Sequence, residues 1–163
     1  MVKIGILTGS TRDSRVNSQV AEWVKSMADK RGDADYELVD IKDYNLPRFN
    51  EPIPAIMSQD YTTPEAHVWS KKINELDGFI FVTPEYNKAI TSGLKDAIDY
   101  LYVEWNNKAA GIVSYGSTLG GYSNKRLTFD FKCSKSSSSW PKCCHEFVYG
   151  LPGYARIYPS VFP

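Results

Sequence analysis

The stretch GFIFVTPEYN, residues 78–87, decides the fold class of this chain. Its first half, 78–82, is an uninterrupted apolar run with the length of a β-strand. Its second half is polar and contains Pro84, which ends regular structure. Strands that are apolar at every position are buried on both faces, as in parallel sheets covered by helices. The stretch therefore predicts a central strand of an α/β protein, with a loop at the carboxyl end of that strand.

Segments of the same kind alternate with helical patterns on both sides of this strand. Apolar segments of strand length occupy 2–7, 36–39 and 109–113, and apolar residues at helical spacing occupy 20–27, 64–76 and 93–102. Strands that alternate with helices predict a doubly wound parallel sheet in three layers, α-β-α. We expect Trp23, Met27 and Trp69 to belong to the core, because they recur at the helical period.

The alternation changes after residue 121. The next helix is expected within 122–140, but this segment contains the serine-rich run 134–139, and serine clusters favour loops. Residues 147–149 have the composition of a short strand, and four prolines interrupt the rest of the segment. We therefore expect a domain at 1–121 and a Ser/Pro-rich tail at 122–163. Such a tail puts the fifth strand and the last helix in question and leaves the strand at 109–113 as an exposed edge.

Composition and charge exclude several classes of protein. The 163 residues suggest one domain, and nineteen basic residues balance nineteen acidic ones. There is thus no net positive charge to attract nucleic acid or an anionic membrane, and no apolar run of about 18 residues for a spanning helix. Cys133, Cys143 and Cys144 do not resemble a secreted disulfide framework, and with His145 they lack zinc spacing. We expect a cytoplasmic protein without a metal.

Three loops follow strands and should meet at one edge of the sheet, where ligands of such sheets bind. Residues 9–18 open a helix and combine hydroxyl groups with Arg12 and Arg15. Free backbone N–H groups at a helix start, together with these side chains, suit a phosphate. An ordinary capped helix start with exposed arginines has the same composition. The loop matches neither the dinucleotide nor the Walker pattern.

The other two loops suit a planar group. Residues 83–87 offer Tyr86 as a flat face, and 114–122 contain glycines that let the backbone approach a ligand closely. Each loop taken alone is equally compatible with a plain surface turn or a flexible connection. Taken together, the three loops predict a pocket for a mononucleotide with a planar head group.

Four segments resemble one known family. They are Gly9–Arg12 with Arg15 and Asn17, then 83–87, 93–99 and 113–116. In this order they are similar to the NADPH-dependent FMN reductases, which are flavodoxin-like quinone reductases and azoreductases. The resemblance covers residues 1–121, and the segment after Gly121 departs from the family in being shorter and rich in serine and proline. It implies a flavodoxin-like fold with FMN at the strand ends.

The resemblance also implies a role for particular residues. It assigns the phosphate of FMN to Ser10, Arg12, Arg15, Val16 and Asn17, and the ribityl chain and ring to Pro84, Glu85, Tyr86 and Asn87. It places Ser114, Tyr115 and Gly116 beside the ring, with Gly120 and Gly121 nearby. The helix at 93–102 would lie in a homodimer interface that completes the site for nicotinamide and substrate.

The implied function is that of an oxidoreductase. FMN would carry hydride from NADPH or NADH to a small acceptor, which is a quinone, an azo compound or free flavin. No side chain is assigned as a catalytic acid or base. The alternatives are a non-catalytic electron carrier, a truncated isoform that no longer retains FMN, and a nucleotide-binding protein without flavin. The neutral charge balance favours the enzyme over a carrier, since carriers are more often strongly acidic.

Overall fold

The sheet is parallel throughout, and its strand order is β2-β1-β3-β4-β5. A computed structural model describes residues 1–117, 119–133 and 148–149. Its strands are β1 (Lys3–Thr8), β2 (Asp35–Asp40), β3 (Gly78–Pro84), β4 (Ala109–Tyr115) and β5 (Val148–Tyr149). This order is that of a flavodoxin-like fold, in which the chain reverses direction of winding between β1 and β3.

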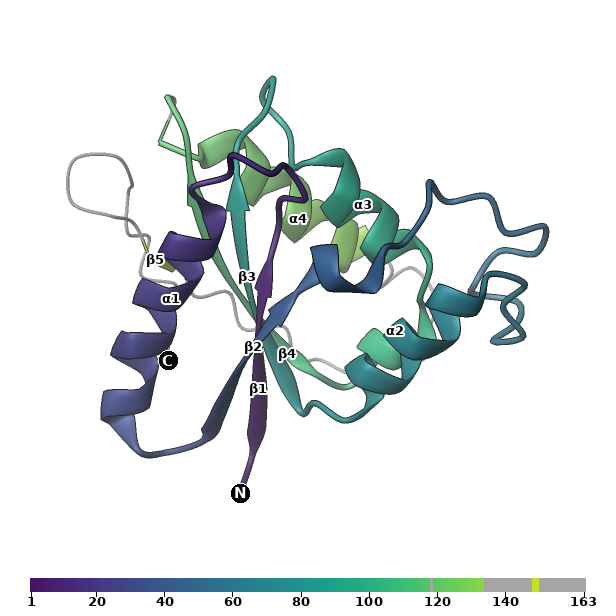
Figure 1. The fold of residues 1–163 in the computed structure, drawn as a ribbon, viewed down its shortest axis with the longest axis horizontal. Helices are drawn as coiled ribbons and strands as arrows, with labels where there is room; N and C mark the ends of the chain where they lie inside the picture. Colours follow the sequence, from purple (N-terminus) through teal and green to yellow (C-terminus); the bar gives the residue numbers. More distant parts are fainter. Residues whose placement is uncertain (118, 134–147, 150–163) are drawn as a thin grey trace.

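The helices cover the two faces of the sheet unequally (Figure 1). They are α1 (Asn17–Ala28), α2 (Pro64–Asn74), α3 (Ser92–Asp99) and α4 (Gly121–Cys133), with short 3-10 turns at Asp29–Arg31, Ile41–Tyr44 and Val103–Trp105. On one face α1 packs Val20 and Val24 against Ile6. On the other face α2, α3 and α4 pack against Leu7 and its neighbours. The predicted three-layer α-β-α architecture is confirmed.

Trp69 on α2 lies at the centre of the larger core. It is fully buried, and its indole Nε1 donates to Ala97 O at 2.7 Å. Its ring meets Tyr44 edge-on at 4.7 Å between centroids and Trp105 at 6.2 Å. Because a buried indole N–H needs an acceptor, the Ala97 carbonyl both satisfies Trp69 and attaches α3 to α2. Its predicted place in the core is confirmed.

The same prediction is wrong for Trp23 and Met27. Their exposed fractions are 39% and 48%, whereas Val20, Ala21 and Val24 on the same helix are buried. A helix lying on a sheet buries only the residues that point at the sheet, so Trp23 and Met27 are on its flank. Within the part of the chain that the structure describes, no second helix packs beside α1 on this face.

The segment after residue 121 is more regular than expected. A helix, α4, runs from Gly121 to Cys133, and its Leu127 is fully buried in the core. The prediction of a loop was wrong for Gly121–Cys133, because the serine-rich run begins only at residue 134. That run lies outside the described residues, as do all four prolines of the tail. The division into 1–121 and 122–163 stays a prediction.

The short strand expected at 147–149 is confirmed as β5. It pairs with Ile112 and Val113 of β4. The expectation that β4 is an exposed edge is therefore wrong at these two positions, since β5 supplies their partner. No helix among the described residues is long and apolar enough to cross a membrane.

The long connection from β2 to α2 is held at its end by a carboxylate. Glu51 accepts hydrogen bonds from Thr62 N and Oγ1, both at 2.8 Å, and from Thr63 N at 2.9 Å. Thr63 precedes Pro64, the first residue of α2. Partial burial opposes the charge on Glu51, but the bonds from Thr63 and Thr62 outweigh it and lower the pKa of Glu51 to about 2.

We expect Glu51 to contribute to stability at neutral pH and to lose this contribution in acid. A carboxyl whose pKa is lower in the folded state stabilises the protein above its unfolded pKa, and this contribution disappears as the pH falls through the folded pKa. For Glu51 the window runs from 4.5 down to about 2. Urea unfolding of the Glu51→Gln variant should show lower stability at pH 7 and a shallower loss of stability below pH 4.5. Stability is expected to be lower at pH 7 because the charge-assisted hydrogen bonds of Glu51 are roughly twice as strong as the neutral ones that glutamine can form.

Asp60 provides the matched control, since it is an exposed carboxylate of the same loop. Its variant Asp60→Asn should retain the wild-type profile. An unchanged acid profile in Glu51→Gln would contradict the assignment.

Candidate functional site

The carboxyl ends of β1, β3 and β4 lie side by side at one edge of the sheet. Thr8 aligns with Val82, and Pro84 aligns with Tyr115. Past these residues α1 leaves toward one face, while α3 and α4 leave toward the other (Figure 1). Ligands of open parallel sheets usually bind at this edge, in the crevice outside the strand ends where the winding reverses. The three loops singled out in the sequence do meet here.

The loop from β1 to α1 is tied closely to β3 and α3. Gly9 N donates to Val82 O at 2.7 Å, and Thr91 Oγ1 donates to Gly9 O. Thr91 is also the N-cap of α3, where its hydroxyl accepts from Leu94 N at 3.1 Å. The start of the loop is therefore a fixed part of the scaffold.

The first turn of α1 is available to an anion. Val16 stands at the N-cap position with 58% exposure, and no side chain caps the helix. The first N–H groups of a helix have no intrahelical acceptor, and the helix dipole adds positive potential at this end. Val16 thus lies at the start of α1, and its role in holding the phosphate stays a prediction.

The two arginines of the loop differ in their partners. Arg15 forms an ion pair with Asp40, and its Nη1 donates to Arg12 O at 3.3 Å. Arg12 is exposed and has no carboxylate partner within the described residues. Its guanidinium instead reaches Ser14 Oγ and Tyr86 OH, both at 3.4 Å. Arg12 is therefore the cation that remains free to meet an anionic ligand.

Tyr86 connects the second loop to the first. Its hydroxyl lies 3.4 Å from the buried Ser10 Oγ, and the Arg12 guanidinium carbon is 5.8 Å from the centre of its ring. Partial burial raises the pKa of Tyr86, but the hydrogen bonds from Ser10 and Arg12 and the charge of Arg12 outweigh this and lower it. Ser10, Arg12 and Tyr86 thus form one polar cluster across the crevice.

A tight turn holds Tyr86 in place. Tyr86 and Ala89 exchange backbone hydrogen bonds of 3.0 Å in both directions. Between them Asn87 and Lys88 have φ of 51° and 62°. Two consecutive residues with positive φ are the pattern of a type I′ turn, in which asparagine is favoured at the first position. The predicted site residue Asn87 is therefore exposed at the tip of this turn.

Asn17 has an interior position. It is fully buried, and its Nδ2 donates to Val82 O at 2.9 Å and to Tyr115 OH at 3.2 Å. Burial raises the pKa of Tyr115, while the hydrogen bond from Asn17 opposes this shift. The Oδ1 atom of Asn17 has no partner within the described residues. Asn17 therefore joins the strand ends, and one acceptor is left over for a ligand or a water.

The third loop is a backbone cradle. Ser114 Oγ donates to Gly120 O at 2.8 Å, so the predicted Ser114 serves the loop itself. Gly120 has φ of 70°, and a Cβ there would lie 2.5 Å from Ser114 C. A Cβ on Gly116 would lie 2.8 Å from Glu85 Cβ, whereas around Gly121 the space is open. Only glycine permits this close approach of the two loops.

Glu85 caps α4. Its Oε2 accepts from Tyr122 N at 2.9 Å and Ser123 N at 3.3 Å, while Glu85 N donates to Tyr115 O at 2.7 Å. A carboxylate at a helix N-terminus is favoured by the free N–H groups and by the dipole. Glu85, together with the buried Pro84, thereby fixes the second loop against the third.

Asp40 was not singled out in the sequence, yet it belongs to the site. It ends β2, pairs with Arg15 and accepts from Thr8 Oγ1 at 2.7 Å. Its sequence signal is an acidic residue at the end of the strand expected at 36–39. No group of metal-binding side chains gathers within the described residues, and Cys143, Cys144 and His145 lie outside them.

The arrangement suits a phosphate ester that carries a flat ring. One end of the crevice has the uncapped start of α1, the free Arg12 and a buried N–H without a partner among the described residues, Arg15 Nε. The other end is lined by the closely packed backbones of 84–87 and 114–116. FMN has this combination of phosphate, hydroxylated chain and planar ring, so the residues present fit it.

Comparison with known proteins agrees with this geometry. Residues 2–128 match the family described as NADPH-dependent FMN reductase. The chain belongs to the NADPH-dependent FMN reductase family. Among curated members, an NAD(P)H-dependent FMN reductase of Schizosaccharomyces pombe is 44% identical over 120 residues, which cover 73% of this chain and 60% of the relative.

A second relative and a solved structure extend the comparison. An NAD(P)H:quinone oxidoreductase of Solanum tuberosum is 34% identical over 74% of this chain and 62% of its own length. The chain thus spans less than two thirds of these two relatives. The flavoenzyme NAD(P)H:(acceptor) oxidoreductase FerB of Paracoccus denitrificans has the same fold, with a TM-score of 0.65 and 21% identity over 93% of this chain and 77% of FerB.

Proposed function

We propose that this member of the FMN reductase family binds FMN at the carboxyl edge of its sheet and passes reducing equivalents from NADPH or NADH to a small acceptor. The observation that carries the proposal is the free guanidinium of Arg12 beside the uncapped start of α1. Across the crevice lie the second and third loops, which glycine residues allow to pack closely. Bound FMN supplies the two-electron chemistry.

The chain's own residues bind and orient the cofactor. The N–H groups at the start of α1, the Ser10 hydroxyl and Arg12 hold the phosphate, since charge-assisted hydrogen bonds are the strong ones. The backbones of 84–87 and 114–116 hold the chain and ring, and Tyr86 shields them. Backbone N–H groups near Ser114 favour negative charge on the ring when it is reduced. No side chain of the described site is needed as an obligate acid or base.

The acceptor we propose is a quinone, an azo compound or free flavin. Relatives at 34% identity include a 2-hydroxy-1,4-benzoquinone reductase of a Burkholderia species besides the plant enzyme.

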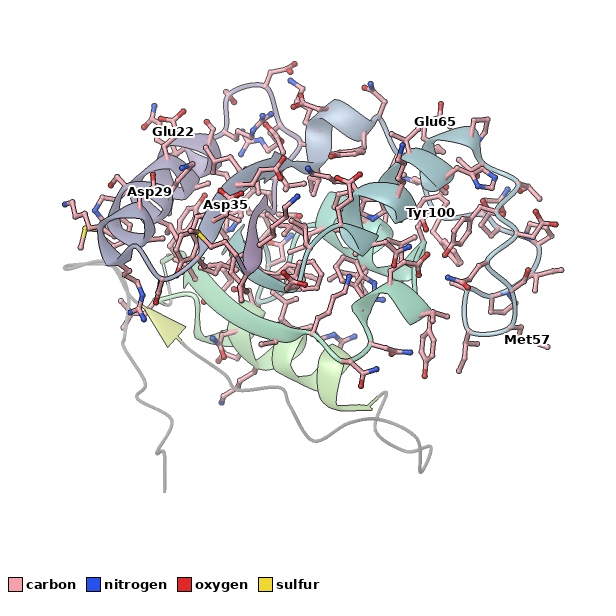
Figure 2. The ribbon with its side chains drawn as sticks, turned by 90° about the horizontal axis from the view of Figure 1, so that it is seen from below. Glu22, Asp29, Asp35, Met57, Glu65 and Tyr100 are labelled. Atoms are coloured by element: carbon pink, nitrogen blue, oxygen red, sulfur yellow. The ribbon has the colours of Figure 1, made fainter. Side chains whose placement is uncertain are left out.

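We also propose a homodimer. The exposed Ile53, Ile56 and Met57 support an interface formed by the β2–α2 loop. Figure 2 shows Met57 at the outer edge of the molecule. The cytoplasmic location stays a prediction.

The test is the visible absorption spectrum of the purified full chain mixed with FMN without oxygen. We expect flavin bands that co-elute with the protein, bleach on addition of NADPH or NADH, and return on addition of a quinone. A chain that retains no FMN would contradict the proposed function. A chain that retains FMN and does not bleach would indicate the electron-carrier alternative instead.

A further inference from the structure

The geometry points to Asp40 as a positioning residue that acts through Arg15 to hold the β1–α1 loop in the shape that receives the cofactor phosphate. This inference rests on the proposed function. It concerns a residue on β2, which is not one of the three strands whose loops meet at the crevice. Arg15 is then an internal support of the loop, and the charge offered to the phosphate comes from Arg12.

Asp40 is held on three sides. Its Oδ1 accepts from Thr8 Oγ1 at 2.7 Å and from Lys42 N at 3.0 Å, and its Oδ2 accepts from Arg15 Nη2. The first contact comes from the neighbouring strand β1, and the second from the 3-10 turn that follows β2. The contacts from Thr8 and Lys42 fix the carboxylate independently of Arg15, so Asp40 can hold Arg15 in place.

Arg15 transmits this position to the loop. Its side chain is 12% exposed, and one guanidinium group donates both to Asp40 and, at 3.3 Å, to Arg12 O. A planar guanidinium has its donors in a rigid fork, so fixing one donor fixes the direction of the other. Asp40 thus determines where the backbone of Arg12 lies. The backbone position in turn sets where the Arg12 side chain, the free cation, leaves the loop.

A second ion pair between the same two segments provides a matched control. Lys42 Nζ and Asp13 Oδ1 are 2.5 Å apart, and they also join the β1–α1 loop to the residues after β2. The Asp13 side chain is 96% exposed, against 23% for Asp40. Exposed pairs contribute little to structure, because water and salt screen them. Asp13→Asn removes the same charge from the same region without removing the internal support.

The sign of the effect separates positioning from competition. If Asp40 merely competes with the phosphate for Arg15, the Asp40→Asn variant releases a second cation and FMN binds more tightly. If Asp40 positions the loop, the variant loses the support and FMN binds more weakly. Riboflavin reports on the rest of the site, since it has the ring and the ribityl chain without the phosphate.

The experiment measures dissociation constants of FMN and riboflavin for the full chain by quenching of flavin fluorescence. For Asp40→Asn we expect FMN affinity to fall about tenfold, because the loop loses its internal support, with riboflavin changed less than about twofold. Asp13→Asn should leave both constants within about twofold, as expected for an exposed pair. Arg15→Gln should weaken FMN binding, and Asp40→Asn should add little to it, because residues of one network are not additive.

Each other outcome overturns the inference. Unchanged or tighter FMN binding by Asp40→Asn would do so. An equal loss of affinity for FMN and riboflavin would do so too, as would additive effects when Asp40→Asn and Arg15→Gln are combined. Far-UV circular dichroism checks that each variant folds. If Asp40→Asn does not fold, Arg15→Lys replaces it, because lysine keeps the charge but cannot bridge Asp40 and Arg12 O. Failure of the wild-type chain to bind FMN would overturn the proposed function itself, which distinguishes the two cases.

Discussion

Replacing Trp69 by alanine should destabilise the protein more than any other single change discussed above. Trp69 is fully buried between α2, α3 and the sheet. Its removal leaves a cavity and strips Ala97 O of the indole donor that lies 2.7 Å away. Truncating a buried tryptophan costs about 3–5 kcal/mol, a large part of the roughly 5–15 kcal/mol that holds a domain together. Urea unfolding followed by circular dichroism measures the change.

Trp23 supplies the matched control for this prediction. It is the same residue type on a helix, but it is 39% exposed on the flank of α1. Trp23→Ala should lower stability by about 1 kcal/mol or less, as is usual for positions outside the core. Equal losses of stability in the two variants would contradict the prediction that Trp69 on α2 is a core residue and Trp23 on α1 is not.

The second large effect is expected on cofactor binding when Arg12 is replaced by alanine. Arg12 carries the exposed guanidinium of the β1–α1 loop, which donates hydrogen bonds to Ser14 Oγ and Tyr86 OH. A hydrogen bond to a charged group contributes about 1.5–3 kcal/mol, which corresponds to a loss of roughly ten- to a hundredfold in FMN affinity. Fluorescence titration with FMN measures the loss, and riboflavin binding should change little.

Arg31 is a suitable control for the loss of positive charge. It is 62% exposed and pairs with Asp33, at the end of α1 opposite the crevice. Arg31→Ala should leave the FMN dissociation constant within about twofold, since its charge is distant and screened. If the two variants lower the affinity for FMN equally, general electrostatic attraction explains the binding, and the specific role assigned to Arg12 is wrong.

The strands and the loops between them could be predicted from local sequence. Continuous apolar runs such as 78–82 identify strands buried on both faces, and alternation with helical patterns leaves few topologies. Once the strands are known to be parallel, their carboxyl ends must share one edge. The meeting of the β1, β3 and β4 loops therefore follows from the order of the elements. Period alone did not separate Trp69 from Trp23, because burial depends on what lies opposite each helix face.

The pairing of side chains was decided only by the tertiary structure. In the sequence Arg12 and Arg15 are equivalent basic residues, but in the fold Asp40 lies beside Arg15 and leaves Arg12 free. Glu85 likewise proves to be the cap of α4, a helix that begins 36 residues after it in the chain (121 − 85). Hydrogen bonds and ion pairs act over a few ångströms, and residues distant in sequence enter that range only after the sheet has formed. The order of the elements in the sequence therefore predicted which edge of the sheet carries the candidate site, and only the fold showed which side chains are free there.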